Sequence, residues 1–68
     1  MTLAEHLFQL RTEQHLKQQD LVEQVGIGLR AYKNYERGLR EPPLSIAVAL
    51  ADFYKITLDE LVGRERNP

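Results

Sequence analysis

The sequence predicts an all-α protein, and three observations support this prediction. Leu3, Leu7 and Leu10 recur at the spacing of one helical face. Two Thr-x-x-Glu segments match the capping box that opens many helices. No segment sustains the period-two alternation that a half-buried strand requires. We therefore expect a compact bundle of five short helices.

The first helix should begin directly after Thr2. The Thr2 and Glu5 side chains can each reach a backbone N–H that the first turn leaves unpaired. Phe8 is expected to broaden the apolar stripe that the three leucines form, and the helix should fade over residues 13–15. This helix supplies one wall of the core.

Two helices flank a short turn in the middle of the chain, the second over residues 18–25 and the third over 29–36. Gly26 and Gly38 should end them, because glycine takes the left-handed conformation without a Cβ clash. Ile27 is expected to fill the turn. The side chains expected to face the core are Leu21, Val22, Val25, Ala31, Tyr32 and Tyr35.

The third helix has two different faces. Its tyrosines can turn inward, which leaves Arg30, Lys33, Asn34 and Arg37 outside. Apolar and aromatic residues inside, with arginine, lysine and amide side chains outside, are typical of a helix that enters the major groove of DNA.

The last two helices follow Pro42-Pro43, which favours extended backbone and then a helix start. A fourth helix is expected over residues 44–53. Thr57 and Glu60 then open a one-turn fifth helix that Gly63 ends. The side chains of these two helices available to the core are Ile46, Ala47, Leu50, Ala51, Tyr54, Leu58, Leu61 and Val62.

The 68 residues allow one small domain, expected over 1–63 and followed by a short tail, 64–68. The net charge is −1, but the stretch from Gly28 to Arg40 carries +3. A small positive face on an acidic body suits docking to phosphates in one orientation. With no cysteine and no apolar run near the ~20 residues of a membrane span, we expect a cytoplasmic protein without a membrane partner.

The sequence gives no pattern of an enzyme, a metal site or a bound cofactor. Ser45 has no histidine placed to activate it. His6 and His15 are interpreted as surface residues and not as zinc ligands. Gly26-x-Gly28 lacks the third glycine and the preceding strand of a nucleotide loop.

Several motifs together resemble the Cro-like, XRE-type helix-turn-helix regulators. The similarity runs from about Leu3 to Gly63 and needs no insertion. The motifs that carry it are Gln18-x-x-Leu21, Gly26-Ile27, Tyr35-Glu36-Arg37-Gly38, Pro42 and Leu58-Asp59-Glu60-Leu61. The resemblance implies a lambda-repressor-like five-helix bundle whose second and third helices form the helix-turn-helix, with double-stranded DNA as partner.

The resemblance also implies roles for individual residues. Gln18 matches a glutamine that bonds a phosphate and braces the recognition helix, and Arg11 with Glu36 matches a structural ion pair. Arg37 and Arg40 fall where the following loop tracks the phosphate backbone. The positions that match base-reading ones are Leu29, Arg30, Lys33 and Asn34. The complete expected DNA-binding set is Lys17, Gln18, Gln19, Gly28, Leu29, Arg30, Lys33, Asn34, Arg37 and Arg40.

Three positions depart from the family pattern. Lys17 and Gly28 stand where the family has Ser or Thr caps, so each helix start loses a side-chain acceptor. Gly28 instead lets backbone N–H groups approach a phosphate. Lys55 stands where glycine or asparagine often ends the fourth helix, which leaves the local turn geometry open.

Two of these side chains suit base recognition. Arg30 can pair bidentately with guanine, and Asn34, one turn later, with adenine. Leu29 can touch a thymine methyl, while Lys33 is left open between base and phosphate.

One such domain makes few contacts, so a homodimer on a palindromic site is expected. The expected dimer interface combines Pro42 and Pro43 with Leu58 and Val62, although the same side chains could instead belong to the hydrophobic core. The function expected is regulation of transcription, by repression. The alternative is an antitoxin or antirepressor that acts mainly through a protein partner.

Overall fold

The protein, described by a computed structural model over residues 2–63, is built of five helices, and within that range no strand occurs. The all-α prediction is confirmed. The expected tail, 64–68, lies outside the described residues. The helices are α1 (Leu3–Glu13), α2 (Gln18–Val25), α3 (Leu29–Arg37), α4 (Leu44–Tyr54) and α5 (Leu58–Leu61).

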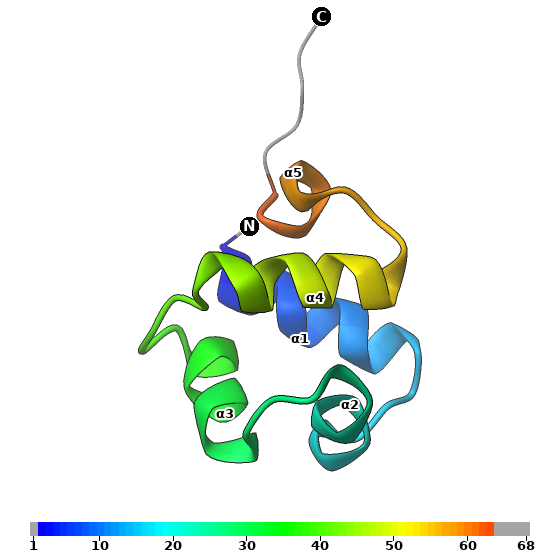
Figure 1. Ribbon diagram of the computed structural model, residues 1–68, viewed down its shortest axis with the longest axis vertical. Helices are drawn as coiled ribbons and strands as arrows, with labels where there is room; N and C mark the ends of the chain where they lie inside the picture. Colours follow the sequence, from blue (N-terminus) through cyan, green and yellow to red (C-terminus); the bar gives the residue numbers. More distant parts are fainter. Residues whose placement is uncertain (1, 64–68) are drawn as a thin grey trace, which may run out of the picture.

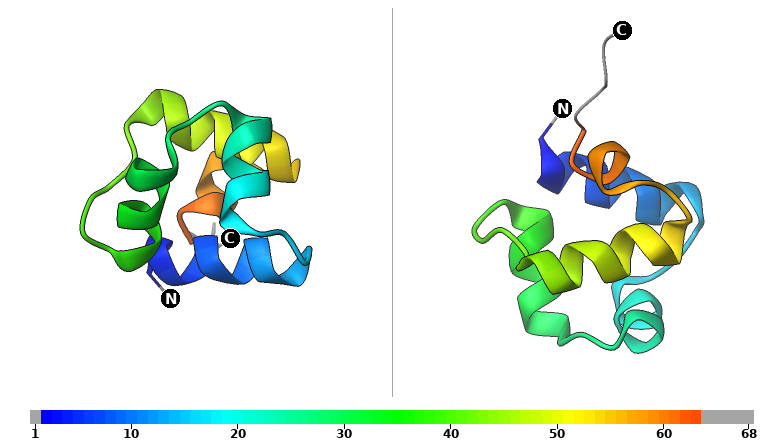
Figure 2. Two further views of the ribbon diagram at one scale, coloured as in Figure 1. Left: turned by 90° about the horizontal axis from the view of Figure 1, so that it is seen from below. Right: turned by 45° about the horizontal axis from the view of Figure 1, so that its top comes forward.

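The helices divide between the two ends of the molecule. α2 and α3 form one end, at the bottom of Figure 1, and α5 lies at the other end. Seen from below, α2 and α3 bridge the space between α1 and α4 (Figure 2). α3 packs against α1 and α2, while α4 packs against α2 and α5. The helix-turn-helix pair is thus carried on a frame made by α1 and α4.

Each helix contributes one large side chain that is fully buried. These five form the centre of the core: Leu7, Leu21, Tyr32, Leu50 and Leu61. Truncation of such a side chain in a well-packed core typically costs about 2–5 kcal/mol. Because all five helices meet at this centre, the position of α3 depends on every other helix.

Both predicted capping boxes are present. The Thr2 hydroxyl accepts from the Glu5 backbone N–H and the Glu5 carboxylate accepts from the Thr2 N–H, and Thr57 and Glu60 repeat this arrangement. Such a cap stabilises a helix by about 1 kcal/mol. α5 is a single turn, so its cap has a large share in keeping it helical.

Four helices end in one backbone motif, in which a left-handed residue lets the following N–H bond back to the last turn. Gly26 ends α2 (φ 84°) and Gly38 ends α3 (φ 76°), as predicted. Lys55 (φ 59°) ends α4 in the same left-handed conformation, so a lysine takes the place that glycine or asparagine often has in the family. His15 (φ 57°) has this conformation after α1. The return bonds are Leu16 to Arg11, Ile27 to Val22, Leu39 to Asn34 and Ile56 to Ala51.

Two expectations for α1 are wrong. Phe8 does not widen the apolar stripe but is 54% exposed, because it lies about 100° around the helix from Leu7. His6 is not a surface residue: it is half-buried, and its Nδ1 lies 2.7 Å from the Leu61 carbonyl oxygen. His6 therefore links α1 to α5.

Two helix ends also differ slightly from prediction. α3 continues one residue further, to Arg37, and α4 continues to Tyr54. Both helices run up to the residue just before their left-handed terminator, Gly38 or Lys55.

Candidate nucleic-acid interface

The outer side of α3 carries the polar side chains that the sequence singled out. Arg30, Lys33 and Arg37 are exposed, and Asn34 is half-buried beside them. Their spacing of three and four residues places them on one face of the helix. The opposite face is fixed in the core by Tyr32, which is fully buried, and Tyr35, which is 6% exposed.

Leu29 differs from its expected place on that outer face. It is half-buried and packs against the core cluster. At the first position of α3 its side chain points partly back toward the protein, so only part of it is available for contact with a base.

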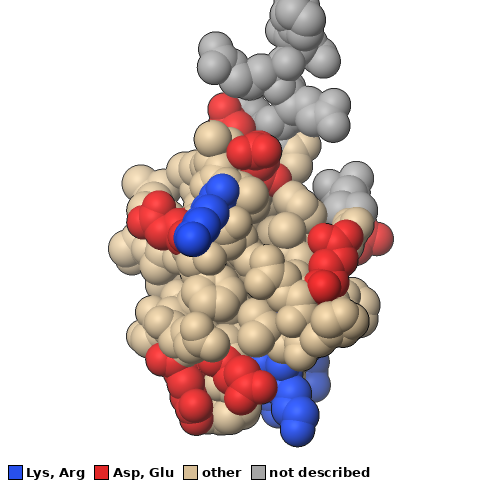
Figure 3. Space-filling view, turned by 90° about the vertical axis from the view of Figure 1, so that its right-hand side faces the viewer, with Lys and Arg blue, Asp and Glu red and all other residues tan. Residues whose placement is uncertain are grey.

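Figure 3 faces the α2 side of the molecule, where basic side chains project at the end that α2 and α3 form. The cations of this part are Lys17 at the start of α2, Arg30, Lys33 and Arg37 on α3, and Arg40 in the following loop, all of them exposed. Acidic side chains lie next to the basic ones at the same end. Asp20 and Glu23 on α2 are exposed as well. The face is therefore mixed, and an approaching polyanion meets attraction in only part of it.

The loop after α3 is held by the helix that precedes it. The Asn34 carbonyl oxygen accepts from the Leu39 N–H at 3.0 Å and from the Arg40 N–H at 3.4 Å. This fixes the backbone of Arg40 relative to the last turn of α3 and to Arg37. The two arginines are thereby kept at the same end of α3.

The start of α3 is open. Gly28 precedes the helix with no side-chain cap, and a Cβ added there would meet nothing within 4 Å. The first turn contains no acidic residue. Uncapped N–H groups at a helix start, together with the helix dipole, favour an anion such as a phosphate. Lys17 also gives α2 no side-chain cap, as its sequence position suggested.

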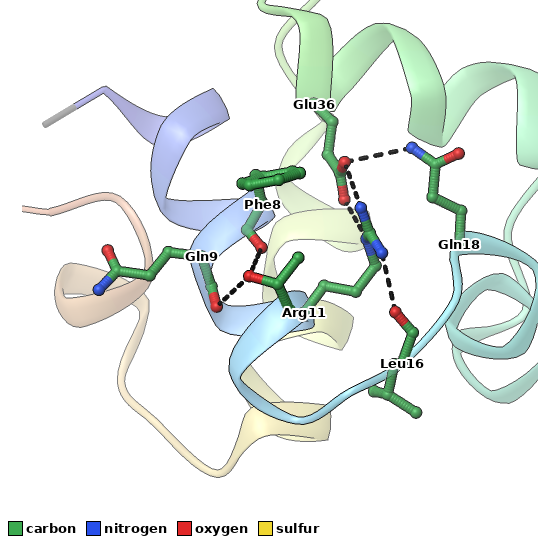
Figure 4. Close-up of polar contacts among 7 residues, drawn as sticks. Phe8, Gln9, Arg11, Leu16, Gln18 and Glu36 are labelled. Carbon is green, nitrogen blue, oxygen red and sulfur yellow. Dashed lines mark hydrogen bonds and ion pairs between the residues drawn. The ribbon is translucent and has the colours of Figure 1, made fainter.

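A polar network behind this face joins three helices (Figure 4). Arg11 donates to the two carboxylate oxygens of Glu36, from Nε at 2.6 Å and from Nη2 at 3.0 Å, and its Nη1 donates to the Leu16 carbonyl at 2.8 Å. The ion pair expected between Arg11 and Glu36 is thus present. Gln18 Nε2 adds a third bond to Glu36, at 3.1 Å.

The network is largely withdrawn from solvent. The side chains of Arg11 and Glu36 are 12% and 6% exposed. Burial raises the pKa of the Glu36 carboxyl, but the hydrogen bonds and charge of Arg11, together with smaller contributions from the nearby Tyr32 hydroxyl and from Gln18, outweigh that effect and hold the pKa below its ordinary value of 4.5. Glu36 is therefore ionised at neutral pH, and it ties α3 to both α1 and α2.

Phe8 covers the outer side of the network. The Arg11 Cζ atom lies 5.5 Å from the centre of the Phe8 ring, in the range of a cation–π contact. This contact accounts for an aromatic ring left half in solvent. The i, i+3 spacing of Phe8 and Arg11 on α1 was the available sign in the sequence.

Gln19, the neighbour of Gln18, has a different environment. Its Nε2 donates to Glu23 at 2.8 Å on the exposed side of α2. Gln18 thus faces α3 and Gln19 faces solvent, although both were expected to contact DNA.

Two tyrosine hydroxyls lie in the core without a partner. Among the described residues, neither the Tyr32 nor the Tyr54 oxygen has a hydrogen bond. Burial is the main reason that the pKa of each phenol is raised, that of Tyr54 to about 12. Both phenols therefore stay neutral, and the role of Tyr32 is to anchor α3 rather than to stack on a base.

The residues expected at a dimer surface differ in how far the structure buries them. Leu58 and Val62 are half-buried, with Leu58 packed on the core, and Pro42 is half-buried while Pro43 is exposed. The apolar side chains left in solvent near the α3–α4 loop are others: Leu39 is 68% exposed, Leu44 69% and Val48 41%. We call Leu39, Pro43, Leu44 and Val48 the apolar patch. Leu44 and Val48 lie one turn apart, outside the stripe of Ala47, Leu50 and Ala51, and that spacing was the available sign in the sequence.

Residues 2–63 contain no group of three His, Asp or Glu side chains placed to hold a metal ion. In the same part of the chain, no helix combines the length and the apolar character that crossing a membrane requires.

Comparison with known proteins agrees with this geometry. The helix-turn-helix family model matches residues 7–61. The transcriptional regulator AnsR of Bacillus subtilis is 37% identical over 62 residues, which are 91% of this chain and 53% of AnsR. The phage repressor RstR of Vibrio cholerae is 38% identical over 54 residues, 79% of this chain and 49% of RstR. This chain thus spans about half the length of these relatives.

A solved structure has the same fold. The crystal structure of a transcriptional regulator from Listeria innocua superposes with a TM-score of 0.86 at 28% sequence identity, over 98% of this chain and 63% of that one. The match includes the two central helices that carry the basic face. From the family model, the relatives and the fold together, we conclude that this chain belongs to the XRE-type, Cro-like helix-turn-helix family.

Proposed function

We propose that this domain binds double-stranded DNA in a sequence-specific manner, with α3 in the major groove. The observation that carries the proposal is the two-sided α3: its tyrosines are fixed in the core, while Arg30, Lys33 and Arg37 are exposed on the other side. A helix with its side chains is about 10–12 Å across, and the major groove is about 12 Å wide. The names of the relatives as transcriptional regulators support the same function.

Within this proposal, Arg30 and Asn34 recognise bases. Arg30 suits the O6 and N7 acceptors of guanine, and Asn34 suits the N6 and N7 atoms of adenine. Each such pair discriminates against a wrong base by about 1–3 kcal/mol. Lys33 lies between the two on the same face and serves either a base or a phosphate.

The phosphate contacts come from both helix starts and from the loop. Lys17, Gln18 and Gln19 lie at the start of α2, and Gly28 opens the start of α3. Arg37 and Arg40 contact phosphates of the DNA backbone beyond the C-terminal end of α3. With about four phosphates neutralised by each protomer, a dimer should show a log–log salt slope near −7.

We further infer that two copies bind together. Half-sites one DNA turn apart, about 34 Å, let a homodimer place one α3 in each of two successive major grooves. The apolar patch begins in the same loop as Arg40, so contact there would place a second copy next to the phosphate contacts. The apolar patch, which includes Pro43 and has Pro42 as its neighbour, replaces Leu58 and Val62 as the main surface, because Leu58 packs on the core.

Regulation of transcription by repression follows from this proposal. A protein that occupies an operator excludes other proteins from it without any further activity, and RstR is named as a repressor. The alternative, an antitoxin or antirepressor acting through a protein partner, is favoured only by the exposed apolar patch. The two functions need different residues, so mutation separates them.

Selection of bound duplexes from a random library, followed by sequencing, tests the proposal. We expect one motif with two half-sites. On the selected duplex, Arg30→Ala and Asn34→Ala should each lower affinity at least tenfold and relax the preference at one base pair. Lys55→Asn is the matched control, because it removes a charge outside the α2–α3 face and keeps a residue that tolerates φ > 0.

Two results would change the conclusion. If no motif emerges at low ionic strength, sequence-specific binding is wrong. If the α3 variants bind like the wild type while Leu44→Asp and Val48→Asp abolish activity, the partner is a protein.

A further inference from the structure

We propose that Asp20 and Glu23, two acidic residues on the outer face of α2, increase the preference of the domain for its own DNA sequence. They do so by repelling phosphates more strongly in nonspecific complexes than in the complex that seats α3 in the major groove. This inference rests on the proposed function. It gives a role to acidic side chains at the end of the molecule that faces DNA, where negative charge by itself only weakens binding.

The two carboxylates lie on the same side of α2. They stand three residues apart on the helix, and both residues are exposed. Gln18, on the other side, donates to Glu36 of α3 at 3.1 Å. Asp20 follows Gln18 by two residues, which is about 200° around a helix, so it points away from α3. The outer face of α2, formed by Asp20 and Glu23, is therefore turned away from the groove that α3 would occupy.

Neither of these charges is neutralised by the protein itself. In the described part of the chain, no lysine or arginine forms an ion pair with either carboxylate. Glu23 accepts a hydrogen bond from Gln19 Nε2 at 2.8 Å, which holds the carboxylate on the outer face and leaves its charge in place. A phosphate that approaches this side of α2 therefore meets two negative charges.

The stability of α2 accounts for only one of the two acids. Asp20 lies in the first turn, where the helix dipole favours a negative charge. Glu23 lies in the last turn, where the dipole favours a cation, and α2 carries no cation there. The bond from Gln19 is exposed to solvent and offsets little of this. Glu23 thus occupies a position that the helix does not favour, which points to a role outside the fold.

The acids act differently on nonspecific and on specific binding. On a duplex of arbitrary sequence only the exposed cations hold the domain, so it can turn relative to the duplex. Arrangements in which the outer face of α2 meets the duplex bring both carboxylates close to phosphates and are weakened by repulsion. The arrangement with α3 in the groove keeps them further away. The acids therefore lower nonspecific affinity more than specific affinity, and the preference is the difference between the two.

Asp20→Asn/Glu23→Gln tests the inference, because both substitutions remove a charge and keep the shape of the side chain. Affinities for the selected duplex and for a duplex of scrambled sequence are measured at low ionic strength. We expect the affinity for the scrambled duplex to rise about tenfold, and that for the selected duplex by no more than about threefold. Both gains should shrink at high ionic strength, because salt screens charges that are not in contact.

Asp52→Asn/Asp59→Asn is the matched control. It changes the net charge by the same amount, but these exposed residues lie on α4 and α5, outside the end formed by α2 and α3. It should raise both affinities slightly and equally. Glu23→Gln alone should give part of the loss of preference, and it keeps the test valid if Asp20→Asn weakens the start of α2.

The two duplexes also separate this inference from the proposed function. Equal gains on both duplexes in Asp20→Asn/Glu23→Gln would overturn the inference, because the acids would then set only the overall affinity. The same loss of preference in the control would overturn it too, because net charge alone would explain the effect. If the wild type binds both duplexes equally, the proposed function is wrong. If the wild type prefers the selected duplex and the variants prefer it as strongly, only the inference is wrong.

Discussion

Arg11 of α1 and Glu36 of α3, 25 residues apart in the sequence, share two hydrogen bonds of 2.6 and 3.0 Å. The side chains that surround them exclude most water. This contact is the direct polar link between the N-terminal helix and the helix proposed to read DNA. Several properties of the fold should depend on it.

Removal of one partner of this pair should destabilise the domain far more than removal of both. Arg11→Met leaves the Glu36 charge nearly buried and unpaired, and breaking a buried pair in this way costs about 3–5 kcal/mol. Arg11→Met/Glu36→Met should cost much less. Urea unfolding followed by circular dichroism measures both values. Equal losses would show that the charge is solvated in Arg11→Met.

Acid should weaken the same link. The pKa of Glu36 lies below 4.5 in the folded protein, so its contribution to stability is complete above about 4.5 and is lost as the pH falls through the folded value. Glu5 and Glu60, in the capping boxes, also have lowered pKa values and act in the same direction. Unfolding free energies measured between pH 7 and 3 should therefore decline below pH 4.5. The decline should be shallower in Arg11→Met/Glu36→Met, and an equal slope would contradict the role given to Glu36.

The buried tyrosine hydroxyls make an unusual prediction. Tyr32→Phe and Tyr54→Phe should be neutral or stabilising by up to about 1 kcal/mol, because each removes a buried polar group that has no partner. Tyr35→Ala, which removes a ring that packs in the core, is the destabilising comparison. A loss above 1 kcal/mol in either Phe variant would reveal a hydrogen bond to that hydroxyl.

The Tyr54 phenol should also affect stability in alkali. Its pKa rises from 10.0 to about 12 on folding, so the folded state keeps a proton that the unfolded chain releases above pH 10. Its contribution is complete below pH 10 and is lost as the pH rises toward 12. Tyr54→Phe should lose less stability than the wild type between pH 9 and 11. If the stability of Tyr54→Phe and of the wild type changed identically with pH, the raised pKa of Tyr54 would be contradicted.

Substitution by glycine at two helix ends should stabilise the folded domain. His15 and Lys55 adopt φ values of 57° and 59°, a conformation that costs an ordinary residue roughly 1 kcal/mol. His15→Gly and Lys55→Gly should each raise the unfolding free energy by about that amount, as seen in the midpoint of thermal or urea unfolding. Gly26→Ala, the reverse change at an equivalent position, should lower it. Destabilisation by both glycine variants would mean that these side chains make contacts that outweigh the strain.

The sequence predicted the features that depend on near neighbours. Helix starts at Thr2 and Thr57 and helix ends at Gly26 and Gly38 are local, because each cap bonds within a few residues of itself. The contact of Arg11 with Glu36 was expected only from resemblance to a family, since nothing local relates two residues so far apart.

The features that the sequence missed depend on packing between helices. Phe8 was expected to widen the apolar stripe, yet its ring stays half exposed and lies against Arg11, one turn along the same helix. His6 finds its partner in α5, 55 residues away. Leu44 and Val48 lie outside the stripe that was expected in the core, but the sequence did not show that the other helices leave them exposed, as they are in the described part of the chain. Exposure of an apolar side chain is set by what lies opposite, which periodicity does not contain.

Whether the outer face of α3 lies against bases can be read from NMR spectra of the domain bound to DNA. The ¹⁵N-labelled domain would be titrated with the selected duplex, and backbone shift changes would be mapped onto the five helices. We expect the backbone of α5 to be nearly unaffected and the largest changes to fall on Gly28, Arg30, Lys33, Asn34 and Arg40. Shift changes concentrated on α4 and α5, with none on the outer face of α3, would contradict contact between α3 and the bases.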